Sequence, residues 1–129
     1  MSYHYTAAST LLALLIYAGV SYNVAMARGR YKIKAPAVTG DVNFERAYRV
    51  QMNTLEQLAF FLPSMWLYAV TLNDIGAAVG GVIWVVGRVI YAFSYLKDPA
   101  TRSSGFTIAF VAAVGLFLGA IYGVARTFI

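Results

Sequence analysis

Long apolar stretches separated by short polar segments run through almost the whole chain. A helical stretch of about 21 residues, rising about 1.5 Å per residue, reaches about 32 Å and matches the roughly 30 Å hydrocarbon core of a bilayer. The second stretch also has a polar N-terminal extension that belongs to the same helix. The pattern therefore predicts four membrane-spanning helices, over residues 6–27, 44–72, 75–97 and 104–127.

The polar connections between these helices contain turn-forming residues. The first connection is the one sizeable loop, and the second is minimal, so the helices on either side of it form a tight antiparallel pair. Asp98-Pro99 ends the third helix, because proline disfavours helical geometry in the residue before it. Ser103 or Ser104 then caps the fourth helix. With no repeat or second domain visible, we expect an all-α, antiparallel four-helix bundle as a single domain over residues 1–129.

Composition supports an integral membrane protein. Hydrophobic residues make up 60% of the chain and charged residues only 12%, which leaves too little polar surface for an ordinary soluble domain. A net charge of +5 suits nucleic-acid binding in a soluble protein, but here the cations flank the apolar stretches, so we expect no nucleic-acid partner. With no cysteine and His4 as the single histidine, we expect no metal site.

The cations predict the orientation of the bundle. Basic residues gather in cytoplasmic loops, and the second connection offers only Asn73 and Asp74. The first and third connections share a side, so we expect both in the cytoplasm and both termini on the opposite side. Cations of the first loop can also meet anionic lipid headgroups. The basic residues in and around these two connections are Arg28, Arg30, Lys32, Lys34, Arg46 and Arg49, then Lys97 and Arg102.

Ala25-Met26-Ala27 resembles a signal-peptide cleavage site at the end of the first apolar run. The residues before that run carry no lysine or arginine, and the run is longer than a typical signal. We therefore expect the first span to remain part of the protein.

Polar residues form a stripe at the start of the second helix. At about 100° per residue, Arg46, Arg49, Asn53 and Glu56 fall within an arc of about 80°. Counting about 20 residues back from the end of this helix places the membrane boundary near Asn53, so Glu56 lies just inside the apolar core. The stripe therefore forms one face at the edge of the membrane.

The third helix repeats this theme at greater depth. Arg88 lies about 12 Å below the end of its span, on a face it shares within about 60° with Trp84, Tyr91 and Tyr95. Ionisable residues inside a span pair with one another or bind a ligand. One interpretation is a structural ion pair between Arg88 and Glu56. The other is a ligand site.

The excess of cations over acids favours a ligand. One carboxylate, that of Glu56, cannot neutralise Arg46, Arg49 and Arg88 together. Arginine binds carboxylates with two parallel hydrogen bonds, an asparagine amide adds further groups, and a glutamate receives an ammonium. Glutathione fits this inventory, since it has two carboxylates, one amine and one thiol.

The segment from Phe44 to Glu56 resembles the signature of the MAPEG proteins, the membrane-associated proteins in eicosanoid and glutathione metabolism. The similarity extends to the third helix and the turn after it, and thus to nearly the whole chain. The matching residues are Phe44-Glu45-Arg46, Tyr48, Arg49, Asn53 and Glu56, then Gly87-Arg88-Val89, Tyr91, Tyr95 and Arg102-Ser103.

The resemblance implies a homotrimer that binds glutathione between neighbouring subunits near the cytoplasmic face. It also implies that Arg102 stabilises the glutathione thiolate. The implied glutathione contacts are Arg49, Asn53, Glu56, Arg88, Tyr91 and Tyr95, with Gln51 and Arg28 in addition.

Some positions depart from the eicosanoid enzymes of the family. Gln57 follows the glutamate where the leukotriene synthase branch has tyrosine, and Pro63 lies further along the helix than the proline of that branch. The loop over residues 97–101 lacks two residues of the prostaglandin E synthase branch. We therefore expect a bacterial-type general member in the inner membrane, as the segment Phe61-Leu62-Pro63-Ser64-Met65-Trp66 also suggests.

The leading hypothesis is a membrane-bound glutathione S-transferase or glutathione-dependent peroxidase, whose thiolate attacks a lipophilic electrophile or lipid hydroperoxide. An alternative is a non-catalytic glutathione- or lipid-binding membrane protein. A small exporter of cationic drugs is disfavoured, because the first span has no acid and Glu56 lies beside arginines.

Simpler interpretations of single positions also stay open. Tyr91 and Tyr95 can be aromatic residues that only pack, and Arg102 can be a charge that only sets the membrane orientation. We expect Trp84 to be a core residue. Gly115, Gly119 and Gly123 form a row at spacings of four that favours close helix contact, within the chain or between subunits.

Overall fold

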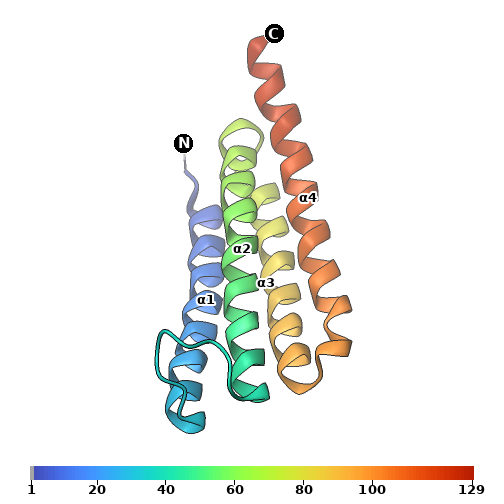
Figure 1. Cartoon of the computed structure of the whole chain (residues 1–129). Coiled ribbons are helices and arrows are strands. Elements are labelled where there is room, and N and C mark those ends of the chain that lie inside the picture. The colour runs from blue at the N-terminus through green and yellow to red at the C-terminus, as the bar shows by residue number, and fades with distance from the viewer. Residues whose placement is uncertain (1) are drawn as a thin grey trace.

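The computed structural model describes residues 2–129, which form four α-helices and two short 3₁₀ turns. The long helices run antiparallel in sequence order, and both chain ends lie at one end of the bundle (Figure 1). The first and third connections lie together at the other end. The elements are α1 (His4–Tyr31), α2 (Val42–Thr71), α3 (Asp74–Lys97), η1 (Pro99–Thr101), α4 (Ser103–Ala125) and η2 (Arg126–Phe128). The all-helical class is confirmed.

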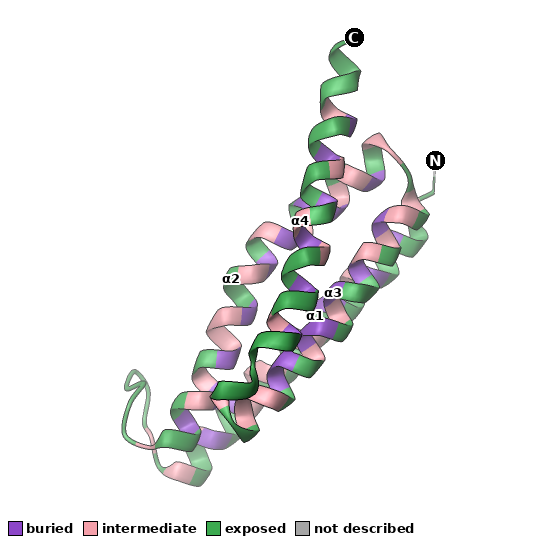
Figure 2. Cartoon of the chain, turned by 90° about the vertical axis from the view of Figure 1, so that its right-hand side faces the viewer, coloured by how far each residue is buried: buried purple, intermediate pink, exposed green. Residues whose placement is uncertain are grey.

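Three of the helical segments in residues 2–129 are long and apolar enough to cross a membrane. They are α1, α3 and the continuous segment Ser103–Phe128. The segment α2 is longer still, at 30 residues, but its first half carries the polar stripe. Large apolar side chains face outward, as for Leu11, which is 68% exposed. Figure 2 shows buried residues turned toward the bundle interior and exposed ones covering its outside.

The helix ends are defined by local hydrogen bonds. The Asp41 carboxylate accepts the N–H groups of Asn43 and Phe44 and so caps α2. The helix α1 ends at Tyr31, beyond the position that hydropathy predicts, because Lys32 adopts a left-handed conformation with φ 57° and closes the last turn. As expected, α3 ends directly before Asp98-Pro99.

The predicted serine cap of α4 is wrong. Arg102 occupies the N-cap position, and no side chain caps this helix. Ser103 is already the first helical residue, because the turn η1 carries the chain around after Pro99 and continues directly into α4. The first turn of α4 therefore begins at Arg102.

The central helices α2 and α3 each pack against the other three helices, while α1 and α4 lie on opposite sides of them (Figure 1). Trp84 of α3 is fully buried and stacks on Phe61 of α2, with ring centroids 4.2 Å apart. Trp84 is thus a core residue, as expected. Leu58, Met65 and Ala69 of α2 belong to the same cluster.

Glycines allow α3 and α4 to approach closely. A Cβ atom on Gly87 would lie 2.5 Å from the backbone nitrogen of Ala109, and one on Gly105 would overlap the backbone of Tyr91. No side chain fits at either contact. This crossing places the start of α4 against the end of α3 that carries Tyr91.

The glycine row of α4 divides between two environments. Cβ atoms on Gly119 and Gly123 would overlap Tyr68 and Thr71 of α2, so these two glycines serve packing within the chain. Gly115 has nothing within 4 Å of its Cβ direction in the described residues. Beyond this region α4 projects past the rest of the bundle (Figure 1).

Candidate functional site

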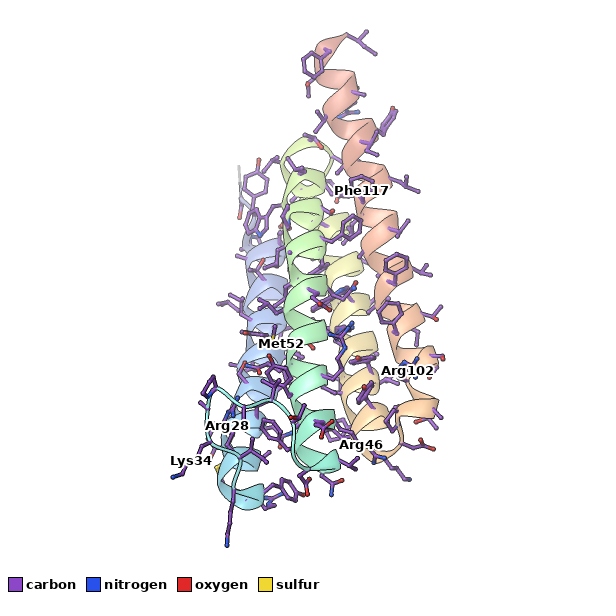
Figure 3. The ribbon with its side chains drawn as sticks, in the orientation of Figure 1. Arg28, Lys34, Arg46, Met52, Arg102 and Phe117 are labelled. Carbon is purple, nitrogen blue, oxygen red and sulfur yellow. The ribbon has the colours of Figure 1, made fainter. Side chains whose placement is uncertain are left out.

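A cavity of about 560 Å³ opens between α2, α3 and the start of α4. It lies toward the end of the bundle that holds the first and third connections, where Figure 3 labels Arg102. Two arginines, an asparagine and two tyrosines that the sequence predicts as site residues meet there. The lining residues are Arg49, Asn53, Tyr91, Tyr95, Arg102, Ser103, Phe106 and Thr107.

The rim of the cavity carries an ion pair. Nη2 of Arg49 lies 3.3 Å from Oε1 of Glu56, and the two side chains are 50% and 53% exposed. Within residues 2–129 this is the one salt bridge. Arg102 has no carboxylate partner among these residues, and its Nη1 donates to the carbonyl oxygen of Pro99 at 2.8 Å. The cavity lining therefore has two guanidinium groups, and Glu56, which the sequence predicts as a ligand contact, lies beside it as the partner of Arg49 and does not line it.

The start of α4 adds a further electropositive element. Among the described residues no side chain caps this helix, so the positive end of its dipole favours an anion near the first turn. Arg102 and Ser103, the N-cap and first residue, both line the cavity. An anionic ligand would thus meet a guanidinium and a helix start at one wall.

Aromatic rings form the wall between the two arginines. The Tyr91 ring lies 5.6 Å from that of Tyr95 and 6.2 Å from that of Phe106. Across from them Asn53 is half-buried, and its Oδ1 is buried without a hydrogen-bond partner in the described residues. The aromatic wall and the Asn53 amide thus lie beside the cations of the cavity.

Arg88 lies behind this wall and not in it. Its side chain is 1% exposed, and its Nη2 donates to Oγ1 of Thr54 at 2.9 Å. Its guanidinium carbon lies 4.1 Å from the centroid of the Tyr91 ring and 5.9 Å from that of Trp84. Arg88 does not line the cavity, although the sequence predicts it as a ligand contact.

The interpretation of Arg88 and Glu56 as a structural ion pair is wrong. Glu56 pairs with Arg49 of its own helix, and Thr54 takes its place beside Arg88. The physical reason is helix rotation, since residues two apart point about 160° away from each other on a helix. Thr54 faces α3, so Glu56 faces outward.

Gln51 and Arg28, also predicted as ligand contacts, lie away from the cavity of their own chain. The Gln51 amide donates to Ser21 of α1 at 3.2 Å. Arg28 donates to the carbonyl oxygen of Ala37 at 2.8 Å and lies 4.9 Å from the Phe44 ring centroid. Figure 3 shows Arg28 and Arg102 on opposite sides of the bundle.

Sequence reasoning missed four residues that belong to the site or support it. Ser103, Phe106 and Thr107 follow Arg102 at helical spacing, so a helix start at Arg102 would have placed them on one face. Thr54 gave no comparable signal. Only the packing of α2 against α3 shows that it contacts Arg88.

The fold and the cavity together define an all-helical protein with membrane-type spans and a basic, aromatic-walled site. The model of the MAPEG family matches residues 6–122, and the chain belongs to this family. An uncharacterized protein of Synechocystis sp. is 42% identical to it over 89% of this chain and 84% of the relative. Human microsomal glutathione S-transferase 2 is 32% identical, over 95% of this chain and 84% of its own length.

Leukotriene C4 synthase of Rattus norvegicus is 29% identical, over 91% of this chain and 83% of the synthase. The matched region includes every residue that lines the cavity.

Proposed function

We propose that the protein is a membrane-bound glutathione transferase whose cavity between α2, α3 and α4 holds glutathione. The observation that carries this proposal is the excess of arginine over carboxylate at the cavity: Arg49 and Arg102 both line it, and the one carboxylate paired there is that of Glu56, beside Arg49. The relative named microsomal glutathione S-transferase 2 supports the same substrate. A bacterial-type general member is our more specific assignment.

The groups of glutathione match those around the cavity. A carboxylate of the tripeptide receives the Arg49 guanidinium, and Glu56 receives the ammonium. The Asn53 amide, which lines the cavity, pairs with a peptide group, and the hydroxyl groups of Tyr91 and Tyr95 donate to remaining oxygens. Each buried polar group of the ligand thereby gains a partner.

Arg102 supplies the chemistry. A free thiol has a pKa of about 8.5, and a neighbouring cation and a helix start lower it. Each unit by which the thiol pKa falls corresponds to about 1.4 kcal/mol of thiolate stabilisation. The thiolate attacks the electrophilic carbon of a lipophilic substrate, a thioether forms, and the leaving group departs with its electron pair.

A peroxidase activity extends the same chemistry. With a lipid hydroperoxide the thiolate attacks the outer oxygen, the O–O bond breaks, and the lipid alkoxide takes a proton to become an alcohol. The resulting sulfenic acid condenses with a second glutathione to give the disulfide and water.

We also propose that all four helices span the membrane and that three copies assemble. Since α2 packs along α1 and α3, it crosses the membrane together with them. The basic connections then lie on the cytoplasmic side of a bacterial inner membrane. Gln51 and Arg28 lie away from their own cavity. In a closed ring of three copies, each subunit contacts its neighbour through a different surface. Gln51 and Arg28 of one subunit then lie at the cavity of the next.

The test compares wild type with Arg102→Ala in purified, detergent-solubilised protein. Glutathione affinity is measured by calorimetry, and turnover by conjugation to an activated aryl halide. We expect Arg102→Ala to lose turnover by about a hundredfold, as for one lost electrostatic stabiliser, while affinity changes only a few-fold. Arg30→Ala, which alters an exposed cation at the same end of the bundle, is the matched control and leaves both unchanged.

Two outcomes would contradict this proposal. Glutathione binding that survives the double variant Arg49→Ala, Glu56→Ala would place the ligand elsewhere. Binding without turnover over a broad electrophile and peroxide panel would instead establish the non-catalytic glutathione- or lipid-binding alternative.

A further inference from the structure

Arg88 is a buried cation that the proposed chemistry does not use directly. We infer that Thr54 is a positioning residue that, through Arg88, holds and polarises Tyr91 in the cavity wall. This inference rests on the proposed glutathione site and assigns Thr54 a part in it. The contacts run in one chain, from the Thr54 hydroxyl to the Arg88 guanidinium and from there to the Tyr91 ring.

The guanidinium of Arg88 is held by the Thr54 hydroxyl and by the Tyr91 and Trp84 rings. It is 1% exposed, and its Nε and Nη1 atoms have no hydrogen-bond partner in the described part of the chain. Its Nη2 is the nitrogen that bonds to a protein side chain, at 2.9 Å from Oγ1 of Thr54. Since a buried cation depends on each polar contact it makes, this bond sets the orientation of the guanidinium.

The Thr54 hydroxyl is itself fixed. It donates to the carbonyl oxygen of Val50 at 2.7 Å, so its lone pairs remain for Arg88. The residue is 1% exposed and β-branched, which restricts its rotamer. The acceptor that Arg88 meets is therefore in place before any ligand binds.

Tyr91 transmits the effect to the cavity. Its ring lies 4.1 Å from the guanidinium carbon of Arg88, and the same residue lines the cavity. A cation on the ring face attracts the π electrons and draws electron density from the phenol oxygen. The Tyr91 hydroxyl thus becomes a stronger donor to a carboxylate or thiolate of the ligand.

The test is a double-mutant cycle between Thr54→Val and Tyr91→Phe, read as glutathione affinity in the purified protein. Thr54→Val keeps the shape and removes the acceptor, and we expect it to weaken binding about five- to tenfold, as for one lost hydrogen bond. In the Tyr91→Phe background the same change has less than about a twofold effect, because the hydroxyl through which it acts is gone.

Thr54→Ser is the matched control, since it keeps the hydroxyl and should bind glutathione like wild type. Thr54→Ala is made in parallel as a second variant without the hydroxyl. Equal effects of Thr54→Val in both backgrounds would overturn the inference, because a merely structural role weakens binding whether or not Tyr91 has its hydroxyl.

A readout without glutathione separates this inference from the proposed function. In protein with carbon-13 at the tyrosine Cζ atoms, Tyr91→Phe identifies the Tyr91 resonance. We expect that resonance to move in Thr54→Val and Thr54→Ala and to stay in place in Thr54→Ser. A resonance that is unmoved in the hydroxyl-free variants refutes the coupling, whereas wild type that binds no glutathione refutes only the proposed function.

Discussion

The molecule carries two kinds of arginine within reach of one cavity, and they have opposite surroundings. At the rim, Arg49 is half-exposed and pairs with Glu56. One layer deeper, Arg88 is buried with no carboxylate in the described residues and bonds to the neutral hydroxyl of Thr54. We call the first the rim pair and the second, with Thr54 and Tyr91, the buried arginine layer.

The difference in exposure assigns the rim pair to ligand binding and Arg88 to the structure of the bundle. A solvated ion pair holds its partners weakly, so the rim pair can exchange its mutual contact for the charges of a ligand. Arg88 of the buried arginine layer is surrounded by the Tyr91 and Trp84 rings and cannot be exchanged so easily. We therefore expect changes in the rim pair to alter affinity, and loss of Arg88 itself to alter stability first.

The largest effect should follow from Arg88→Ala. This change leaves an empty space in the bundle, and we expect it to lower the free energy of unfolding by about 2–5 kcal/mol, as other large-to-small changes in a core do. Chemical unfolding in detergent micelles measures this. Arg46→Ala is the matched control, because this less buried arginine only contacts the carbonyl oxygen of Lys97 at 3.5 Å. Equal losses in both variants would show that the burial of Arg88 adds nothing to its effect on stability.

Gly105→Ala should disturb the same layer from the other side. The added methyl group would overlap the backbone of Tyr91, and forcing it in costs about 1–3 kcal/mol. Gly115→Ala in the same helix points into open space and should be neutral or slightly stabilising. Thermal unfolding of the two variants gives the comparison. A harmless Gly105→Ala would mean that α4 does not cross α3 as closely as described.

These two layers also show what the sequence could predict. The four helices follow from the length of the apolar runs, and Asp98-Pro99 marks the end of α3 correctly. Periodicity places Arg49 and Asn53 on one face of α2, and both line the cavity. Such features depend on local spacing along a single helix.

The partner of Arg88 could not be predicted in this way. Whether Thr54 or Glu56 meets it depends on how far α2 is rotated against α3, and only tertiary packing decides that rotation. The close crossing at Gly87 and Gly105 is equally hidden, because the sequence has no regular glycine row there. The start of α4 at Arg102 depends on the η1 turn, which a capping rule for serine does not foresee.

Arg49→Ala should act mainly on the ligand. It removes a charged hydrogen bond to glutathione, worth about 1.5–3 kcal/mol, so we expect affinity to fall at least about tenfold. The free energy of unfolding should change by less than about 1 kcal/mol. Calorimetry and chemical unfolding on the same preparation measure the two quantities. The reverse result, a stability loss with affinity intact, would assign Arg49 to the scaffold.

Glu56→Gln should have the smallest effect on the ligand-free protein. Both side chains of the rim pair are about half-exposed, so its loss should cost less than about 1 kcal/mol of unfolding free energy. Salt screens such pairs, with a Debye length of about 3 Å at 1 M, so wild type and Glu56→Gln should converge at high salt. The loss of unfolding free energy in Arg88→Ala should persist at high salt, because the buried arginine layer excludes ions. Unfolding curves at low and high salt test both statements, and a salt-independent deficit in Glu56→Gln would show that the rim pair is buried in the assembled protein.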